Sequence, residues 1–527
     1  MLINSVKNTE NKLGLAIGSD LFLTIDYLGK NVIIFNYKLR EEYRSLCLLA
    51  GAFLFLTLSA CAQNPVSGTN DFVMMSEDSE IQIGRQNHPK IIAQYGRYDD
   101  ETLQSYVQSV GERLAAVSHR DNLLYRFTVL DSPVINAFAL PGGYIYITRG
   151  LMAYLNSEAE LAAVLGHEIG HVTARHGVRQ QSASQVAGLG YAVASVFFPE
   201  LRGSASKSAF NVLSGSLLSG YGREHELESD GLGAEYLAKS GYEPKAMIEV
   251  IRVLKAQEVF AAEQAKKQGQ EAKGYHGLFA SHPDNDTRLQ EVVGKAEAFS
   301  SGQKGRLFRK EYLAKIEGLM FGDSEEQGIR SGRHFYHSAM NFAVDFPASW
   351  QIRNQADSVQ SISPNGLAFI EMRAEDLNKK RSPYDFITQR LKLNNLTSGQ
   401  KINSHGLEGY TGLATIQRKP ARVTVIYLNN QAFVFFSGVK NSKDFTQFDV
   451  DFLNAAKSLH RLKKSEQKLA KALRLEVVTV GKGDNYAKWA GQSAISNSPL
   501  SQLKLLNGDY PEGELLKGAQ VKRVKRQ

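Results

Sequence analysis

Apolar residues recur at helical spacing through much of the first half of the chain. Between residues 76 and 118 they occur every three or four positions, for example at Leu103, Val107, Val110 and Leu114, which is the spacing of one helix face. The same spacing predicts further helices over 157–176, 223–239 and 244–263. The first half is therefore predicted to be mainly helical.

Three short extended runs lie between these predicted helices. YRFTVL (125–130) and YIYIT (144–148) flank NAFALPGG (136–143). The Pro-Gly-Gly step at 141–143 is typical of a turn between strands. These runs predict a small β-sheet that accompanies the helices.

The N-terminal sixty residues have the layout of a leader. Residues 45–58 form an uncharged apolar run that basic residues precede. The run is too short for a membrane-spanning helix, which needs about 20 residues. LSAC (58–61) resembles a bacterial lipobox, which makes Cys61 the predicted lipidation site, and Ala62 favours the outer membrane. The alternatives are an ordinary signal peptide or a buried helix with a chance cysteine. Residues 1–37 are unusual for a signal and are interpreted as an over-extended start.

The pattern changes after about residue 320. Extended runs such as FAVDF, RVTVIYL and AFVFFSGV appear there, and an amphipathic helix is predicted over 445–459. The fold class expected is α+β. The predicted segments are a leader over 1–60, a lipidated tether over 61–75, a first domain over 76–320, an α+β domain of unknown role over 325–462 and a small module over 473–527.

The composition is that of an ordinary globular chain. Of the 527 residues, 43% are hydrophobic and 22% are charged, which excludes a disordered chain, a collagen-like chain and a multi-span membrane protein. Two cysteines exclude a disulfide scaffold and a cysteine-based zinc ribbon. A net charge of +8 is mild for this length, and we expect no nucleic-acid partner.

The candidate chemistry lies in HEIGH (167–171), an HExxH motif inside a predicted helix. Positions four apart on a helix lie about 40° from each other, so His167 and His171 emerge on one face and can share one metal ion. Neutral imidazole suits zinc, and a catalytic zinc needs three protein ligands and one open position. Glu168 lies beside the pair and can move a proton between the attacking water and the leaving amine.

The third ligand must come from another part of the chain. His176 lies nine residues after His167, about 180° round the helix, so we expect it to face away as a packing or surface residue. The next predicted helix carries Glu226 as candidate ligand and, one turn later, Asp230 as an acceptor from a ligand imidazole. The alternative is a solvated acidic face. Solvated or local structural roles are expected for Glu224, Glu228 and His225.

Three motifs together resemble one family of gluzincin metallopeptidases, that of the CAAX prenyl endopeptidases, HtpX, BepA and LoiP. They are HEIGH (167–171), the Glu-x-x-x-Asp of 226–230 and NAFALPGG (136–143), within a likeness that covers about residues 70–300. It favours the exported, BepA-like and LoiP-like branch. It implies a mainly helical zincin-type domain with a small sheet edge strand, one Zn2+ held by His167, His171 and Glu226, Glu168 as the base and Asp230 as a supporting residue.

The resemblance extends to three further positions. The family often carries a His-Pro-x-x-x-x-Arg segment, here HPDNDTR (282–288). It implies that His282 either stabilises the oxyanion or occupies the fourth zinc position until a loop moves, and the Gly/Ser/Ala-rich segment 182–222 is a candidate for that loop. Arg288 would pair with a site carboxylate; the alternative is a helix-start His-Pro and a surface arginine. Asn136 matches the edge-strand position that contacts substrate backbone, where an extended peptide can pair with an open strand.

The last module resembles a divergent LysM-type module, a class that binds glycan chains of peptidoglycan. The likeness rests on VVTVGKGDNYAKWA (477–490) and LKLLNGDYPEGELLKGAQVKRV (503–524). The alternative is a small packing module. Basic residues at the chain end could contact an anionic wall or lipid, but such residues are more often solvated; they are Lys517, Lys522, Arg523, Lys525 and Arg526.

These patterns and the resemblance predict a lipid-anchored, zinc-dependent endopeptidase of the bacterial envelope, periplasmic and tethered to the outer membrane. Its expected substrates are unfolded or misassembled envelope proteins, in a role of protein quality control, and peptidoglycan is a further candidate partner. One rival function is an outer-membrane protein assembly chaperone whose latent protease activity is gated by His282. A second is a cell-wall binding protein whose main role is tethering.

Overall fold

The computed structural model describes residues 61–73, 75–182, 222–267, 288, 291–292, 294, 298–299, 305–355, 357–377 and 379–526, and three strands before residue 27. The chain divides into two compact units, Met1–Ala62 and Gln63–Gln527. The first unit contains an antiparallel sheet of β1 (Ser5–Asn8), β2 (Lys12–Ala16) and β3 (Phe22–Asp26). The apolar run 45–58, nearly all of the segment 182–222 and His282 lie outside the described residues.

The predicted helical stretch 76–118 is two helices, α2 (Glu77–Tyr95) and α3 (Glu101–Ala115). They follow the short strands β4 (Cys61–Gln63) and β5 (Asn70–Phe72). Gly96 ends α2 with a φ of 73°, a conformation that glycine adopts without strain. Asp100 then caps α3 by accepting a hydrogen bond from the backbone N–H of Leu103.

A three-stranded sheet has its strands at the predicted extended runs. Its order is β6-β8-β7, with β6 and β8 parallel and β7 antiparallel to β8. The bounds are Arg126–Leu130 for β6, Ala137–Leu140 for β7 and Tyr144–Thr148 for β8. Gly142 and Gly143 have φ values of 80° and 84°, which explains the predicted turn. Within the described residues β7 has a strand partner on one side only and so forms a sheet edge.

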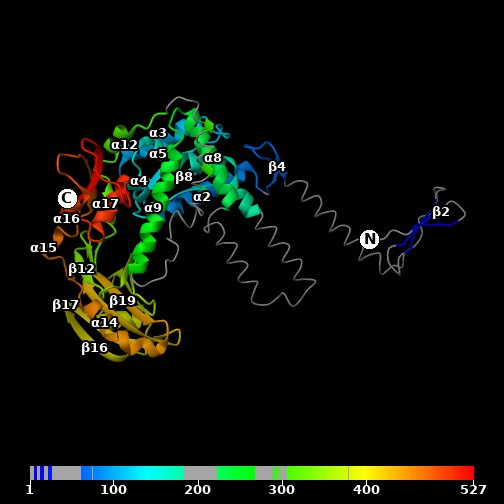
Figure 1. Ribbon diagram of the computed structural model, residues 1–527. Helices are drawn as coiled ribbons and strands as arrows, with labels where there is room; N and C mark the ends of the chain where they lie inside the picture. The colour runs from blue at the N-terminus through cyan, green and yellow to red at the C-terminus, as the bar shows by residue number, and fades with distance from the viewer. Residues whose placement is uncertain are drawn as a thin grey trace. The chain divides into compact units, whose positions relative to one another are not determined.

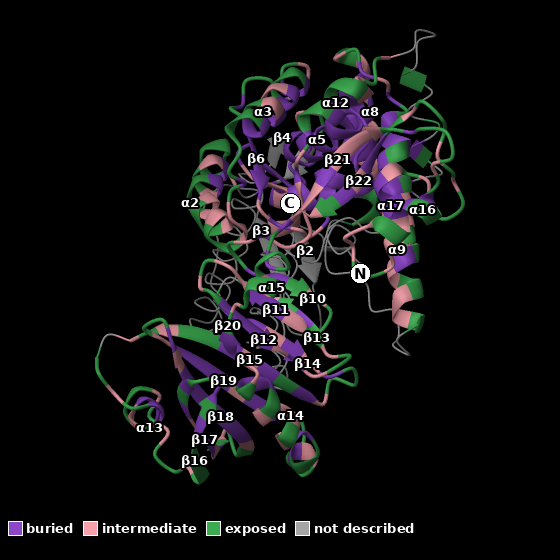
Figure 2. Cartoon of the chain, turned by 90° about the vertical axis from the view of Figure 1, so that its left-hand side faces the viewer, coloured by how far each residue is buried: buried purple, intermediate pink, exposed green. Residues whose placement is uncertain are grey.

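Helix α5 (Glu158–Thr173) lies at the centre of the helical domain, and every one of its residues is buried (Figure 2). Ser157 caps this helix, because its Oγ accepts a hydrogen bond from the backbone N–H of Glu160. Helix α8 (Arg223–Lys239) packs against α5 through small residues, with Gly170 facing Ser229 and Gly166 facing Gly233. Further helices among the described residues of this domain include α4 (Arg149–Tyr154), α9 (Ala246–Lys267) and α12 (Arg309–Lys315).

The sheet domain (residues 329–461) contains two antiparallel sheets. One has the order β10-β11-β12-β20 and the other β13-β14-β15-β19-β18-β17-β16. Phenylalanines of α14 (Phe445–Lys457) pack on one face of the larger sheet, and Phe386 and Ile387 pack with a second apolar cluster that includes β18 residues. Figure 2 shows β18 and β19 buried and the edge strand β16 mostly exposed.

The elements of the sheet domain have these bounds. They are β10 (Ile329–Ser331), β11 (His334–His337), β12 (Phe342–Asp345), β13 (Gln351–Asn354), β14 (Val359–Ile362), β15 (Ala368–Asp376), α13 (Pro383–Asp385), η2 (Phe386–Arg390), β16 (Thr397–Ser404), β17 (Leu407–Ile416), β18 (Lys419–Leu428), β19 (Gln431–Val439), η3 (Ser442–Asp444) and β20 (His460–Arg461). The predicted helix at 445–459 is α14.

The C-terminal module (residues 473–526) shares a hydrophobic core with the helical domain. It follows α15 (Lys464–Gln467) and runs β21 (Leu473–Thr479), α16 (Tyr486–Gln492), α17 (Pro499–Asn507), β22 (Gln520–Arg526), and β21 also pairs with β9 (Met320–Phe321). Figure 1 shows α17 beside α4. Leu475, Trp489 and Leu506 belong to the same apolar cluster as Val107 of α3 and Leu165 of α5.

Four of the five basic residues at the chain end are paired, and the expectation of solvation is wrong for the buried Lys522. The fully buried Lys522 donates to the carbonyls of Ala153 (2.7 Å) and Leu155 (2.6 Å) in the helical domain. Arg523 and Lys525 both bond Glu476, and Arg526 donates to the backbone carbonyls of residues 469 and 471. Of the five, Lys517 and Lys525 are exposed. The reason is that β22 pairs with β21 and is packed against the helical domain.

The expected α+β fold class is confirmed, with helices around the small sheet and a later β-rich region. Among the described residues, no helix is both long enough and apolar enough to span a membrane.

Candidate metal centre

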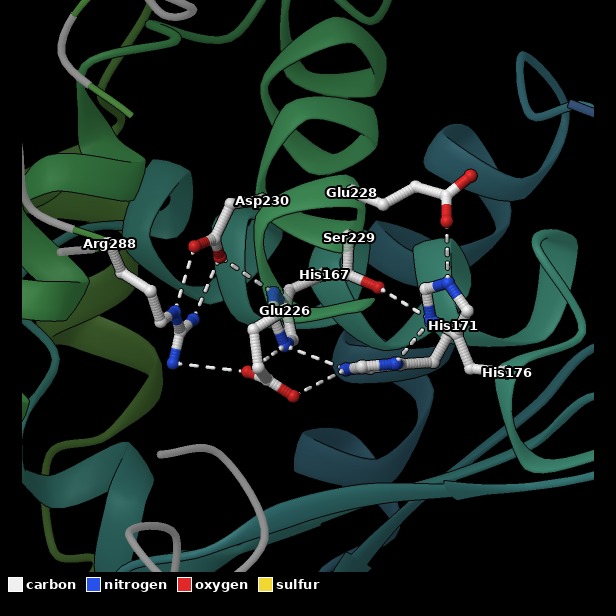
Figure 3. A network of polar contacts seen from close by, with 8 residues as sticks. All are labelled: His167, His171, His176, Glu226, Glu228, Ser229, Asp230 and Arg288. Atoms are coloured by element: carbon white, nitrogen blue, oxygen red, sulfur yellow. Dashed lines mark hydrogen bonds and ion pairs between the residues drawn. The ribbon is translucent and has the colours of Figure 1, made fainter. Parts of the chain in front are cut away.

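Two helices bring together three side chains of the types that can bind a metal ion. His167 and His171 emerge one turn apart from α5, and Glu226 comes from the first turn of α8 (Figure 3). The Nε2 atoms of the two histidines lie 3.0 Å apart. Oxygens of Glu226 lie 3.5 Å from His167 Nε2 and 3.4 Å from His171 Nε2. All three residues are buried, and one donor atom of each lies within 4.8 Å of the other two.

This donor set fits zinc. Zinc binds imidazole nitrogen and carboxylate oxygen at about 2.0–2.2 Å, so neighbouring ligands of a tetrahedral ion lie about 3.3 Å apart. The observed separations, 3.0 to 3.5 Å, bracket that value. Two imidazoles and one carboxylate also leave a fourth position open, as catalytic zinc sites do.

Asp230 and Arg288 support the first ligand. Asp230 Oδ1 lies 2.8 Å from His167 Nδ1, and Arg288 donates to both oxygens of Asp230 at 2.7 and 2.8 Å. Arg288 also lies 3.2 Å from Glu226. Burial opposes ionisation of Asp230, but the charge and hydrogen bonds of Arg288 and the bond from His167 hold its pKa at about 2. An ionised Asp230 accepts the Nδ1 proton of His167 and leaves Nε2 facing the metal position.

The two ligand histidines differ electrostatically. Burial lowers the pKa of His171 well below its usual range, which keeps the imidazole in the neutral form that binds metal. Burial also opposes protonation of His167, but the hydrogen bonds and charges of Asp230 and Glu226 outweigh it and raise the pKa of His167. Metal therefore competes with a proton at His167.

His176 does not face away, which corrects the prediction from helical spacing. Its side chain is fully buried, and its Nδ1 lies 2.8 Å from Nδ1 of His171. The prediction extended α5 through residue 176, but α5 ends at Thr173 and Arg175 has a φ of 56°. Because the backbone leaves the helical path there, the rotation of about 100° per residue no longer applies.

Glu228 and His225 belong to the same cluster, which corrects the expectation that Glu228 is merely solvated. Glu228 accepts from His176 Nε2 at 2.9 Å and from Arg179 at 3.4 Å. The hydrogen bond from His176 is the largest effect on the pKa of Glu228 and lowers it. His225 stacks on His176 with ring centroids 4.2 Å apart. Burial, followed by the charge of His176, lowers the pKa of His225 to about 4. The expectations for Glu224, which is exposed, and for a local role of His225 agree with these positions.

The other predicted residues lie as follows. Glu168 is in α5 beside the ligands and is 1% exposed. Asn136 directly precedes edge strand β7, and its backbone N–H and carbonyl both bond Thr148. A small cavity of about 20 Å³ is lined by Ala139 and Leu140 of this region and by His171. His282 and the side chain of Cys61 lie outside the described residues, so their roles stay predictions.

Comparisons with known proteins agree with this geometry. Residues 101–296 match the model of Peptidase family M48. The beta-barrel assembly-enhancing protease of Yersinia pestis is 28% identical over 244 residues, 44% of this chain and 47% of that protein. The mitochondrial metalloendopeptidase OMA1 of Schizosaccharomyces pombe is 28% identical over 234 residues, 43% of this chain and 64% of that protein.

Several solved structures are similar to parts of the chain. Cyanobacterial PsbP from Synechocystis covers 27% of this chain and 98% of its own, with 12% identity and a TM-score of 0.21, which carries no argument about function. The matches to the beta-barrel assembly-enhancing proteases span less than half the length of those proteins. The matched range contains HEIGH (167–171), Glu226 and Asp230, on which the sequence resemblance rests. Residues 101–296 of this chain are therefore similar to peptidase family M48.

Proposed function

We propose that this chain is a zinc-dependent endopeptidase in which His167, His171 and Glu226 hold the metal. The observation that carries the proposal is the convergence of two Nε2 atoms and one carboxylate from two packed helices onto one buried point. A bound zinc ion supplies Lewis acidity at its open position. The metallopeptidase family matched by residues 101–296 supports the same chemistry.

Glu168 is the proposed proton carrier. It follows His167 directly in α5, and we expect its carboxylate to reach the metal position. There it accepts a proton from the attacking water and delivers it to the nitrogen of the leaving amine. Its burial, at 1% exposure, excludes most bulk water and strengthens its interactions with charge that develops during the reaction.

The proposed substrate is an extended polypeptide segment. Strand β7 forms a sheet edge, and residues of this strand and His171 line one small cavity. An extended chain can add to such an edge through main-chain hydrogen bonds, which require no particular side chains. Unfolded or loosely folded proteins supply such segments, whereas compact folded proteins do not. Asn136, which directly precedes β7, is the proposed contact to the substrate backbone.

The proposed setting is the bacterial envelope. Some relatives of residues 101–296 are named for beta-barrel assembly, which supports misassembled envelope proteins as substrates. The lipobox-like LSAC (58–61) supports lipid attachment at Cys61 and a periplasmic, outer-membrane location. The β-α-α-β order of the C-terminal module is compatible with a LysM-like glycan site, and peptidoglycan binding stays a proposal.

Cleavage by the zinc-loaded wild type and its Glu168→Gln variant tests the proposal. The substrates are an unfolded protein and the same protein folded, and zinc content is measured in each sample. We expect the wild type to cleave the unfolded form preferentially, and Glu168→Gln to cleave about 100-fold more slowly or worse with one zinc per chain retained. Equal cleavage rates for the wild type and Glu168→Gln would contradict the proposal. A zinc-loaded wild type that cleaves neither form would also contradict it and would favour the latent chaperone.

A further inference from the structure

The second ligand histidine has a partner that the HExxH motif does not contain. His171 Nδ1 and His176 Nδ1 lie 2.8 Å apart, and His176 Nε2 lies 2.9 Å from Glu228 (Figure 3). Ser229 Oγ also lies 3.3 Å from His176 Nδ1. The chain of contacts therefore runs from a carboxylate through one imidazole to a candidate metal ligand.

Hydrogen-bond chemistry fixes the direction of this chain. An ionised carboxylate only accepts, so His176 Nε2 donates to Glu228. In a neutral imidazole the other nitrogen is then an acceptor, so His176 Nδ1 receives the proton of His171 Nδ1. His171 is left with its lone pair on Nε2, the atom that lies near His167 and Glu226. The opposite direction would put a proton on Nε2 of His171 and prevent metal binding.

The backbone that delivers His176 is held from another helix. Arg175, at a φ of 56°, turns the chain away from α5. Its guanidinium donates to Glu80 of α2 and to the backbone carbonyl of Met75. Glu80 is buried and also accepts from Arg120 at 2.9 Å. Left-handed backbone at a non-glycine residue costs free energy and persists only when surrounding contacts impose it.

We propose that His176, oriented by Glu228, is a positioning residue that sets the tautomer and ring orientation of His171 for zinc. The proposal rests on the proposed function, because it presupposes a metal at His167, His171 and Glu226. In this proposal a carboxylate orients each of the two ligand histidines. Asp230 orients His167 directly, and Glu228 orients His171 through His176. Partners of ligand histidines of this kind typically contribute about 10- to 100-fold to metal affinity.

A pair of substitutions separates hydrogen bonding from packing. His176→Phe keeps ring volume and stacking on His225 but removes the acceptor. His176→Asn loses ring volume but keeps an oxygen that can accept from His171 Nδ1. The zinc dissociation constant of the full-length protein is measured by competition with a chelator of known affinity. We expect His176→Phe to weaken zinc binding by about 10- to 100-fold, and His176→Asn to weaken it less.

Substitutions on α8 provide the matched control. Glu228→Ala removes the carboxylate that orients His176, whereas Glu224→Ala removes the same charge from an exposed position one turn earlier. We expect roughly 10-fold weaker zinc binding for Glu228→Ala and no measurable change for Glu224→Ala. Circular dichroism and thermal unfolding of the zinc-free proteins establish that each variant folds. If the His176 variants do not fold, the Glu228 and Glu224 pair decides.

The outcomes separate this inference from the proposed function. Zinc affinity for His176→Phe equal to that of His176→Asn or the wild type would overturn the positioning role. Equal losses for Glu228→Ala and Glu224→Ala would also overturn it, because the effect would then be one of net charge. A wild type that binds no zinc would instead overturn the metal centre itself.

Discussion

Two of the places where the helical domain buries charged side chains differ in what their polar atoms meet. At the metal centre, His167, His171 and Glu226 turn acceptor atoms toward one point. At the contact with the C-terminal module, Lys522 turns its ammonium toward two backbone carbonyls, those of Ala153 and Leu155. In the first place several acceptor atoms face one another and require an added cation. In the second place the Lys522 ammonium is the cation that the carbonyl acceptors bind.

The difference shows that burial of charge alone does not mark a functional site. Burial lowers the pKa of Lys522 well below its usual range, and the charge of Glu160 opposes this shift. Glu160 itself accepts from the backbone N–H of Asn156 and from Ser157 Oγ, at the start of α5. The polar groups of Lys522 and Glu160 thus find hydrogen-bond partners within the chain, so we assign Lys522 an architectural role. What distinguishes the metal centre is convergent acceptors on rigid helices.

Among the tests of this comparison, removal of the Glu226 carboxylate is expected to have the largest effect, which is a loss of zinc affinity. Glu226→Gln removes the charge while keeping the shape, and we expect zinc affinity to fall by more than about 100-fold, since even residues behind a ligand contribute 10- to 100-fold. Cleavage of unfolded substrate should be lost with the metal. Zinc content after dialysis and the chelator competition measure the effect.

The matched control for this change is Glu224→Gln, on the same helix and exposed. It should bind zinc and cleave as the wild type does. If Glu226→Gln bound zinc with wild-type affinity, the cluster of His167, His171 and Glu226 would be architectural, as Lys522 is. The proposed difference between the two places would then be wrong.

Lys522→Met tests the other half of the comparison. It leaves the carbonyls of Ala153 and Leu155 without their donor, at a cost of about 1–3 kcal/mol for each unsatisfied group, partly offset because a buried ammonium is no longer desolvated. We expect a thermal midpoint roughly 5 °C lower, with zinc affinity and cleavage per folded molecule unchanged. Lys517→Met, in the same segment but exposed, should change neither quantity. Lost zinc binding in a folded Lys522→Met protein would show that the module has more than an architectural role.

The smallest expected effect concerns the spacing of the two ligand helices. A Cβ at Gly170 would lie 3.0 Å from the Cα of Ser229, whereas one at Gly166 would lie 3.4 Å from Gly233. Gly170→Ala should push α8 outward by tenths of an ångström and weaken zinc binding by roughly tenfold, or about 1.4 kcal/mol. Gly166→Ala is the control and should bind zinc normally, because its contact is ordinary. Equal affinities in the two variants would show that α8 adjusts freely.

The sequence predicted the parts of this molecule that depend on local spacing. The candidate ligands four residues apart on α5 and the bounds of α8 follow from helix geometry. His176 was predicted wrongly because one left-handed residue, Arg175, ends the periodicity, and its contacts come from α2.

Long-range pairing accounts for most of what the sequence could not predict. Lys522 bonds carbonyls 369 and 367 residues away. Nothing local in KRVKR distinguishes a buried lysine from a solvated one, so the shared core of the C-terminal module became visible only in the structure. Arg288 was placed beside a site carboxylate by resemblance alone, and the structure brings it to Asp230 and Glu226.

Anomalous X-ray scattering at the zinc absorption edge, from crystals of the zinc-loaded protein, tests the central claim most directly. The account predicts one strong peak within bonding distance of His167 Nε2, His171 Nε2 and a carboxylate oxygen of Glu226, with the His176 and Glu228 contacts intact behind His171. A zinc-loaded crystal with no peak at this point, or a peak held by other residues, would contradict it.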